Sequence, residues 1–315
     1  MLPDGRRLGA HLPIANGLLQ ALDRASAIGA DAMQIFTDNP TAWRRRSEPS
    51  PELADYRAGS EARGIRPIAI HASYLVNLPG PDALTRERSV AMLADELGGA
   101  PSFGARFVNV HIGSHRGAGI EVGIRRLVEG ISAVMASLDG PAGAMLVLEN
   151  SVGAGDGLGV SVDELVAIAE RVDAAGIDHD RVGFCIDLAH AWGAGIDVGD
   201  PAAFDRFVRD LDRGVGLDRL VLVHFNDNRA ELGSRSDRHE HIGAGRIGER
   251  GLAHVLRHPD LAHATYILET PGMDVGYDAV NLDRALALAH GERLAPLPDA
   301  AFQLAGSAQG RMAST

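Results

Sequence analysis

The sequence predicts a single α/β domain of the (β/α)8 TIM barrel class, and three observations support this prediction. Short apolar runs recur along the chain with helix-like segments between them. These runs are apolar on both faces, as in a parallel sheet that is covered on both sides. No linker, low-complexity tract or short repeat interrupts 315 residues that are 45% hydrophobic, enough for one such domain. A doubly wound open sheet is the alternative fold.

The predicted strands are the eight short apolar runs, at residues 8–11, 32–36, 67–71, 107–111, 145–149, 182–187, 220–224 and 266–269. We expect residues 1–295 to form the barrel. Residues 296–315 are rich in Pro, Ala, Gly, Ser and Gln, and we expect them to be a flexible C-terminal tail.

Helix signals lie between these strands. Three predicted helix starts carry side chains that can cap the first turn, namely Asn16, Ser161 and Asp200. Pro81-Asp82 and Asp278 mark two more helix starts. Ser161 and Glu164 have the spacing of a capping box, and Pro201 suits the first position of a helix. Gly29 and Gly176 follow apolar helical patterns and are expected to end their helices.

Six consecutive predicted strands end on a residue that can bind a metal ion: His71, His111, Glu149, Asp187, His224 and Glu269. In a closed barrel the carboxyl ends of all strands meet at one rim, where active sites lie. A single histidine there is more often structural than a ligand. Six in succession, all drawn from His, Asp and Glu, indicate a metal centre.

Three more residues extend this set. His190 follows Asp187 by three positions, so one helical turn places both on one face. Asp237 and His239 are two apart, so an extended loop points both the same way. Imidazole and carboxylate ligands suit zinc or manganese, and the full set exceeds what one ion needs. Several neighbouring ions suit phosphodiester hydrolysis, in which they activate water and stabilise charge on the phosphate.

The sequence resembles the endonuclease IV family of apurinic/apyrimidinic (AP) endonucleases, also called AP endonuclease family 2, with its xylose isomerase-like TIM barrel. The matching blocks span most of the chain: HASYLVNL (71–78), VNVHIGSH (108–115), LVLEN (146–150), VGFCIDLAHAWGAGID (182–197), HFND (224–227), GSRSDRHEHIGAGRIG (233–248) and ILETP (267–271). The resemblance implies a zinc-dependent deoxyribonuclease of base excision repair. Its substrate is double-stranded DNA with abasic sites, which it cuts 5′ to the site to leave a 3′-hydroxyl.

The resemblance also implies roles for single residues, and all positions of the ligand pattern match. The first zinc ion is assigned His71, His111 and Glu149, and Glu149 bridges it to the second. The second is completed by Asp187, His224 and Glu269, and the third takes His190, Asp237 and His239. Manganese is an alternative at one or more of these sites. Glu149 and Glu269 are the candidate catalytic residues, and the candidate DNA contacts are Tyr74, Leu75 and Arg238.

One departure from the family pattern concerns DNA. Family members commonly carry an arginine or a glutamine in the loop after strand two, where this chain has Thr41 within Asn-Pro-Thr-Ala-Trp. The run Arg44, Arg45 and Arg46 follows at once and is the nearest source of phosphate contacts. A solvated basic face is the simpler interpretation of that run.

Composition limits the remaining classes. A net charge of −12 argues against a surface that binds nucleic acid by bulk charge, although bound cations would offset it locally. The lone Cys185 lies in an apolar run and is expected to be a buried, inert thiol. No signal peptide or membrane-spanning run is apparent, so we expect a cytoplasmic protein that makes no membrane contact. Nothing indicates an obligate protein partner.

Two other enzyme classes and one non-enzyme class compete with this interpretation. A sugar isomerase or epimerase on the same barrel needs a Glu, Asp, His, Glu quartet, which Glu149, Asp187, His224 and Glu269 satisfy. That quartet leaves the other ligands without a purpose. A binuclear amidohydrolase is disfavoured because strand one lacks a His-x-His pair, and a DNA-binding scaffold with a vestigial site is disfavoured by the intact ligand set.

Overall fold

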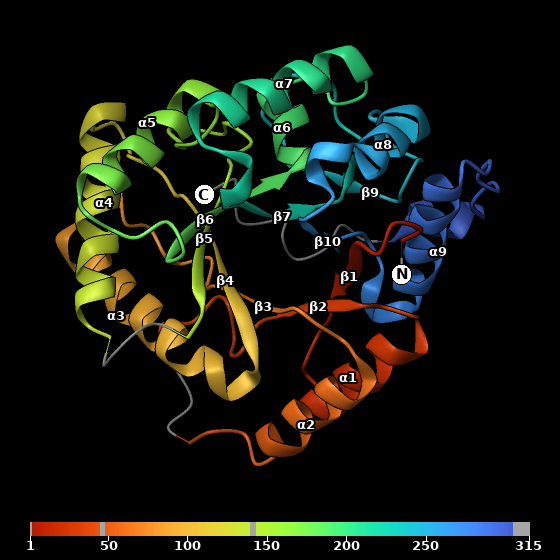
Figure 1. Ribbon diagram of the computed structural model, residues 1–315, viewed down its shortest axis with the longest axis horizontal. Helices are drawn as coiled ribbons and strands as arrows, with labels where there is room; N and C mark the ends of the chain where they lie inside the picture. The colour runs from red at the N-terminus through yellow and green to blue at the C-terminus, as the bar shows by residue number, and fades with distance from the viewer. Residues whose placement is uncertain (1, 45–47, 139–142, 305–315) are drawn as a thin grey trace.

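The computed structural model describes residues 2–44, 48–138 and 143–304. Within them, eight parallel strands close into a barrel in the order β1-β10-β7-β6-β5-β4-β3-β2. Figure 1 looks into this barrel, with the helices arranged around the ring of strands. The predicted (β/α)8 barrel is confirmed, and the open doubly wound sheet is wrong because β1 pairs with both β2 and β10.

The barrel strands are β1 Arg7–His11, β2 Ala32–Ile35, β3 Ile68–His71, β4 Ala105–His111, β5 Met145–Glu149, β6 Val182–Asp187, β7 Leu220–His224 and β10 Thr265–Leu268. Each predicted strand is present, and β5, β6 and β7 have the predicted bounds. Two short strands, β8 Asp227–Asn228 and β9 His239–Glu240, form an antiparallel pair beyond β7.

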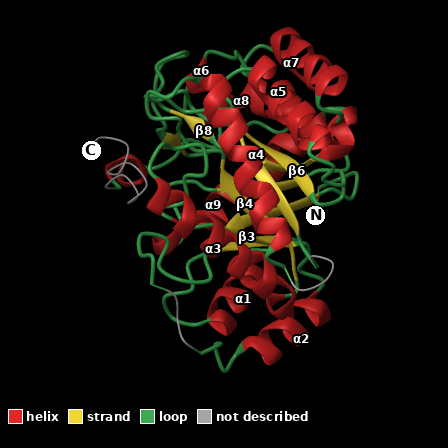
Figure 2. Ribbon diagram, turned by 90° about the vertical axis from the view of Figure 1, so that its left-hand side faces the viewer, coloured by secondary structure: helices red, strands yellow, loops and turns green. Residues whose placement is uncertain are grey.

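The helices are α1 Leu18–Ala27, α2 Leu53–Arg63, α3 Ala83–Gly99, α4 Ile120–Ala136, α5 Val162–Ala174, α6 Leu188–Ala194, α7 Pro201–Gly214, α8 Gly248–Arg257 and α9 Tyr277–His290. The 3-10 helices are η1 Ala100–Phe103, η2 Leu217–Arg219, η3 Pro259–Leu261, η4 Met273–Val275 and η5 Asp299–Gln303. Figure 2 shows the helices outside the yellow strands. None of the described helices combines the length and apolarity required to cross a membrane.

Three predicted helix starts, at Asp82, Ser161 and Asp200, are confirmed. The side chains of Asp82, Ser161 and Asp200 each accept a hydrogen bond from the backbone N–H three residues later. The capping box is incomplete, because Glu164 accepts from the backbone of Gly159 and Val160 rather than from Ser161.

One predicted cap is wrong. Helix α1 begins after Gly17, and its first N–H group, at Leu18, donates to the Glu52 carboxylate rather than to Asn16. This partner lies far away in the sequence, so local spacing could not identify it. The helix start predicted at Asp278 is correct to within one residue, because α9 begins at Tyr277, and the Asp278 side chain forms an ion pair with Arg24.

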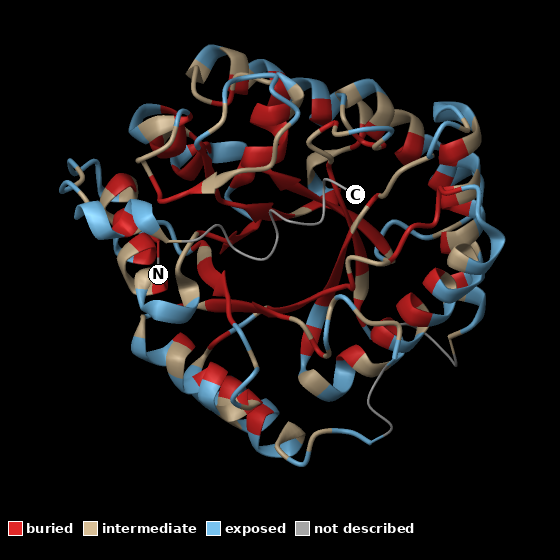
Figure 3. Cartoon of the chain, turned by 180° about the vertical axis from the view of Figure 1, so that it is seen from behind, coloured by how far each residue is buried: buried red, intermediate tan, exposed pale blue. Residues whose placement is uncertain are grey.

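The barrel interior has an apolar floor beneath the strand ends. Ala69, Phe107, Val147, Cys185 and Leu222 form a buried cluster of their own, separate from the larger core. Each of them lies two positions or more before a predicted ligand on the same strand, and alternate residues of a strand share a face. Apolar side chains therefore fill the inside of the barrel up to the level at which the polar strand ends begin. Figure 3 shows the buried strands at the centre.

Part of the expected C-terminal tail is described, up to Leu304. It includes η5, in which Ala301 is buried. The carbonyl of Ala301 accepts a hydrogen bond from His241 Nε2 at 3.0 Å, which joins this segment to the loop before α8. Residues 305–315 lie outside the described residues.

Candidate metal centre

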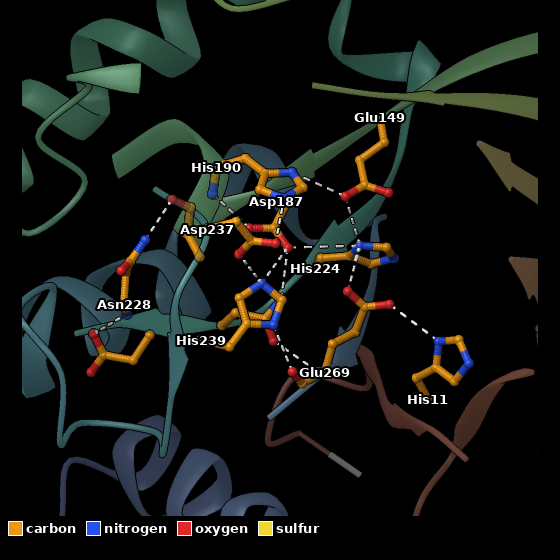
Figure 4. A network of polar contacts seen from close by, with 12 residues as sticks. His11, Glu149, Asp187, His190, His224, Asn228, Asp237, His239 and Glu269 are labelled. Carbon is orange, nitrogen blue, oxygen red and sulfur yellow. Dashed lines mark hydrogen bonds and ion pairs between the residues drawn. The ribbon is translucent and has the colours of Figure 1, made fainter. Parts of the chain in front are cut away.

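The nine predicted ligands lie together at the carboxyl-end rim of the barrel. Six of them follow or end the strands β3, β4, β5, β6, β7 and β10, and three lie on α6 and the loop that contains β9. Figure 4 shows most of them converging on one space. Most are buried, whereas the side chains of His111 and Asp237 keep 42% and 29% of their surface exposed, which leaves an open side for a substrate.

The first group is His71, His111 and Glu149, whose ligand atoms all lie within 4.8 Å of one another. The Nε2 atoms of His71 and His111 lie 3.5 Å and 3.6 Å from Glu149 Oε2. These distances are close to the spacing of about 3.4 Å between ligand atoms in a tetrahedral zinc site with bonds of about 2.1 Å. The group can therefore hold an ion with little movement.

The second group is Asp187, His224 and Glu269, which meet the same distance limit. His224 Nδ1 lies 3.3 Å from Glu269 Oε2 and 3.4 Å from Glu149 Oε1. Glu149 thus directs Oε2 at the first group and Oε1 at the second. A carboxylate in this position can bridge two ions.

The third group combines His190 and His239 with Asp187 and Asp237. His190 Nε2 lies 3.4 Å from Asp237 Oδ2, and His239 Nε2 lies 3.0 Å from Asp237 Oδ1. Asp187 Oδ2 is 3.6 Å from His239 Nε2, so Asp187 adjoins the second and third groups alike. Sequence spacing did not indicate this second role of Asp187.

The loop that carries Asp237 and His239 is held by β8 and β9. His239 pairs with Asn228 across this ribbon. The carboxylate of Asp227 accepts hydrogen bonds from the backbone N–H of Gly245 at 2.9 Å and of Ile247 at 3.0 Å. A Cβ atom at residue 245 would lie 2.4 Å from Asp227 Oδ1, so glycine is required there.

The buried histidines are oriented as metal ligands are. In four of them one ring nitrogen forms a hydrogen bond with a carbonyl oxygen, while the other nitrogen faces carboxylates. The carbonyl oxygen belongs to Ala72 for His71, to Asn150 for His190, to the Gln34 side chain for His224 and to Glu269 for His239. A nitrogen that donates to a carbonyl leaves the lone pair on the other nitrogen. The second nitrogen faces carboxylate oxygens, so it must either carry a proton or bind a cation that it shares with them.

Unpaired buried atoms indicate the same. Among the described residues, four buried atoms of the predicted ligands have no hydrogen-bond partner: Glu149 Oε1, His224 Nδ1, Asp237 Oδ1 and His239 Nε2. A buried polar atom without a partner costs about 1–3 kcal/mol, so several in one place require an explanation. Bound metal ions supply it, and the residues present therefore fit the predicted ions.

The electrostatics favour positive charge in this space. Burial opposes ionisation of Glu149, yet His224 and His111 hold the pKa of its carboxyl well below the usual value. Burial likewise lowers the pKa of His239, but Asp237 more than offsets it and raises that pKa to about 10. Against the effect of burial, His239 and His190 likewise hold the pKa of the Asp237 carboxyl well below its usual value, so Glu149 and Asp237 retain their charge and attract cations into the cluster.

Sequence reasoning missed a layer of buried polar residues behind the ligands. Gln34 Nε2 donates to Glu269 Oε1 at 2.7 Å, and Asn109 Nδ2 donates to Glu149 Oε2 at 2.6 Å. Asn226 Nδ2 donates to Asp187 Oδ2 at 2.7 Å. His11 Nδ1, at the end of β1, lies 3.2 Å from Glu269 Oε1. The sequence feature that could have identified these residues is a polar side chain inside an otherwise apolar strand, or one that lies two positions from a predicted ligand.

The candidate DNA contacts lie at the same rim. The Tyr74 ring packs 5.6 Å from the His71 ring and 5.8 Å from the His111 ring, measured between centroids. Tyr74, Leu75 and Arg238 are all partly exposed. Arg238 follows Asp237 and donates to its carbonyl at 3.4 Å. Contact of these residues with DNA stays a prediction.

Other predicted residues have varied positions. Cys185 is fully buried, as expected, and burial raises its pKa to about 11. His241 is buried, and its Nδ1 lies 2.9 Å from Asn281 Nδ2. Thr41 is exposed and donates to Asn39, and Arg44 is exposed, whereas Arg45 and Arg46 lie outside the described residues.

Comparison with known proteins gives consistent matches. Residues 22–293 match the family model described as "Xylose isomerase-like TIM barrel". A protein of Halothermothrix orenii named "Probable endonuclease 4" is 38% identical over 281 residues, which cover 88% of this chain and 99% of the relative. One of Methanoculleus marisnigri with the same name is 40% identical over 283 residues, covering 90% and 98%. The crystal structure of endonuclease IV from Thermus thermophilus matches with a TM-score of 0.79 and 38% identity, covering 90% and 99%.

Proposed function

Because this chain belongs to the endonuclease IV family, we propose that it is a zinc-dependent endonuclease that hydrolyses the phosphodiester 5′ to an abasic site in duplex DNA. As a member of this family the chain is a hydrolase, an AP endonuclease. The products are a strand that ends in a 3′-hydroxyl and a strand that begins with the 5′-phosphate of the abasic sugar. Such cleavage serves base excision repair.

The third ligand group carries this proposal. A sugar isomerase or epimerase on the same barrel needs the quartet Glu149, Asp187, His224 and Glu269. It has no use for the third group, in which His190 and His239 face Asp237 at 3.4 Å and 3.0 Å. It also has no use for a first group built on two further histidines. Ligands for three ions favour phosphodiester hydrolysis over isomerisation.

When bound, zinc ions supply Lewis acidity: they lower the pKa of the attacking water and neutralise charge on the phosphate and on the leaving 3′-oxygen. The chain's own residues set the geometry for this chemistry. Glu149 faces the first and second groups with different oxygens, and Asp187 lies between the second and third. These two carboxylates fix the spacing of the groups around one phosphate, and manganese fits the same donors.

Access to the site is through its exposed side. His111 and Asp237 keep exposed surface, and Arg238 lies beside Asp237. Arg238 is the residue proposed to bind a DNA phosphate, because guanidinium groups bind phosphate well. Tyr74 and Leu75 are the residues proposed to pack into the space that a missing base leaves in the stack.

A cleavage assay tests this function. A duplex with one abasic analogue, labelled at the 5′ end of the damaged strand, should be cut on the 5′ side of the lesion. The shortened strand should be extendable by a polymerase because it carries a 3′-hydroxyl, and an intact duplex should stay uncut. Metal analysis of the same sample should give at least about three zinc ions per chain, enough to fill the nine-ligand centre. An uncut abasic duplex, or a fragment that cannot be extended, would overturn the proposal.

A further inference from the structure

A second group of potential metal ligands lies outside the nine-ligand centre. It consists of Asp205 on α7, His254 on α8 and His258 directly after α8. Their ligand atoms all lie within 4.8 Å of one another. Helices α7 and α8 belong to the outer layer of the barrel, where they pack against each other.

The distances suit one small cation. His258 Nε2 lies 3.5 Å from Asp205 Oδ1, close to the separation of about 3.4 Å between two ligands of tetrahedral zinc. His254 Nε2 lies 2.5 Å from the same oxygen, in a direct hydrogen bond. This pair would have to separate by about 1 Å around an ion with zinc-like bond lengths. Both side chains have room for that movement because about a third of each is exposed, 31% for His254 and 38% for Asp205.

The third ligand is already in place. His258 is 6% exposed, and its ring packs against the rings of Phe204 and His254, each at 5.7 Å between centroids. The spacing of four residues brings His254 and His258 to one face.

The side chain of His258 forms no hydrogen bond within the described residues, and its Nδ1 is buried without a partner. Its Nε2 nevertheless faces a carboxylate oxygen. Burial also lowers the pKa of His258, which favours the neutral imidazole that metal ions bind. A buried imidazole whose Nε2 faces a carboxylate oxygen at 3.5 Å, without a hydrogen bond between them, leaves room for a cation at Nε2 while Nδ1 carries the proton.

We propose that Asp205, His254 and His258 form a peripheral zinc site that joins α7 to α8, with water completing the coordination. Two imidazoles and one carboxylate favour zinc over magnesium or calcium, which prefer oxygen ligands. The site is independent of the proposed function, because it shares no residue with the nine-ligand centre. Its effect is on stability: an ion that binds only the folded chain raises the melting temperature.

Zinc counting tests this site. The full chain is stripped with a chelator, equilibrated with buffered free zinc and analysed for bound metal. The variants Asp205→Asn and His254→Asn, in which the exchanged side chains are partly exposed, should each bind one zinc ion fewer than the unchanged chain. His258→Asn should do the same. Zinc should raise the melting temperature of the unchanged chain by more than that of the three variants.

The matched control is His179→Asn. His179 Nε2 lies 3.1 Å from Asp173 Oδ1, an exposed histidine–aspartate pair that belongs to none of the ligand groups found among the described residues. This variant should bind as much zinc as the unchanged chain. Equal zinc content in Asp205→Asn, His254→Asn and the unchanged chain would overturn the proposal, as would an equal loss in His179→Asn. Cleavage by the Asp205 and His254 variants should stay unchanged, which separates this result from a failure of the proposed function.

Discussion

Gln34 should control how tightly the second ligand group holds its ion, although Gln34 is not a ligand itself. Its Nε2 donates to Glu269 Oε1 at 2.7 Å, and its Oε1 accepts from His224 Nε2 at 3.1 Å. One side chain thus positions two of the three residues of the group. Gln34→Leu keeps a similar side-chain volume and removes both hydrogen bonds.

The expected magnitude follows from those two contacts. A hydrogen bond to a charged group contributes about 1.5–3 kcal/mol and one between neutral groups about 1 kcal/mol. Part of this is recovered by rearrangement, and loss of a residue that orients ligands typically weakens metal binding by about 10–100-fold. We therefore expect Gln34→Leu to weaken zinc binding at the second group by about 1.4–2.7 kcal/mol, since about 1.4 kcal/mol corresponds to a factor of ten.

Competition with a chromogenic chelator measures this directly. One zinc ion per chain should pass to the chelator at a concentration about 10–100-fold lower in Gln34→Leu than in the unchanged chain. Gln20→Leu is the matched control, because Gln20 is exposed on α1, far in the sequence from any ligand. If Gln34→Leu binds zinc with an affinity within about twofold of the unchanged chain, Gln34 does not position the group.

Three further predictions follow. His239→Ala should keep the circular dichroism of the unchanged chain but lower cleavage of abasic duplex by at least about 100-fold, because the third group loses a ligand; near-normal cleavage would contradict the three-ion assignment. Burial raises the pKa of Cys185 to about 11, so at about pH 8 only about one molecule in a thousand carries the thiolate. A thiol reagent should therefore modify Cys185 only after the chain is unfolded in denaturant. Thr41→Arg should tighten binding to abasic duplex, because Thr41 is exposed and offers no cation. Measured across a salt series, binding by Thr41→Arg should show a steeper salt dependence than binding by the uncharged control Thr41→Gln. An unchanged affinity of Thr41→Arg would contradict this prediction.

The sequence by itself determined the barrel and the main members of the centre. Apolar runs buried on both faces indicate a parallel sheet, and closure brings every strand end to one rim. Strand ends such as His71, Glu149 and His224 therefore had to meet once the barrel was predicted. Local hydrogen bonds were equally readable, because Ser161 and Asp200 cap residues only three positions away.

Contacts between distant segments were decided by the tertiary structure alone. Glu52 caps α1 at Leu18, 34 residues away in the sequence, and Gln34 on β2 reaches Glu269, 235 residues away, because β2 and β10 both flank β1. Asp205 meets His254 only because α7 and α8 pack together. Each of these contacts depends on the register and twist of packed elements, which place side chains to within about an ångström. Periodicity in the sequence gives the face on which a residue lies, but not the residue that it meets there.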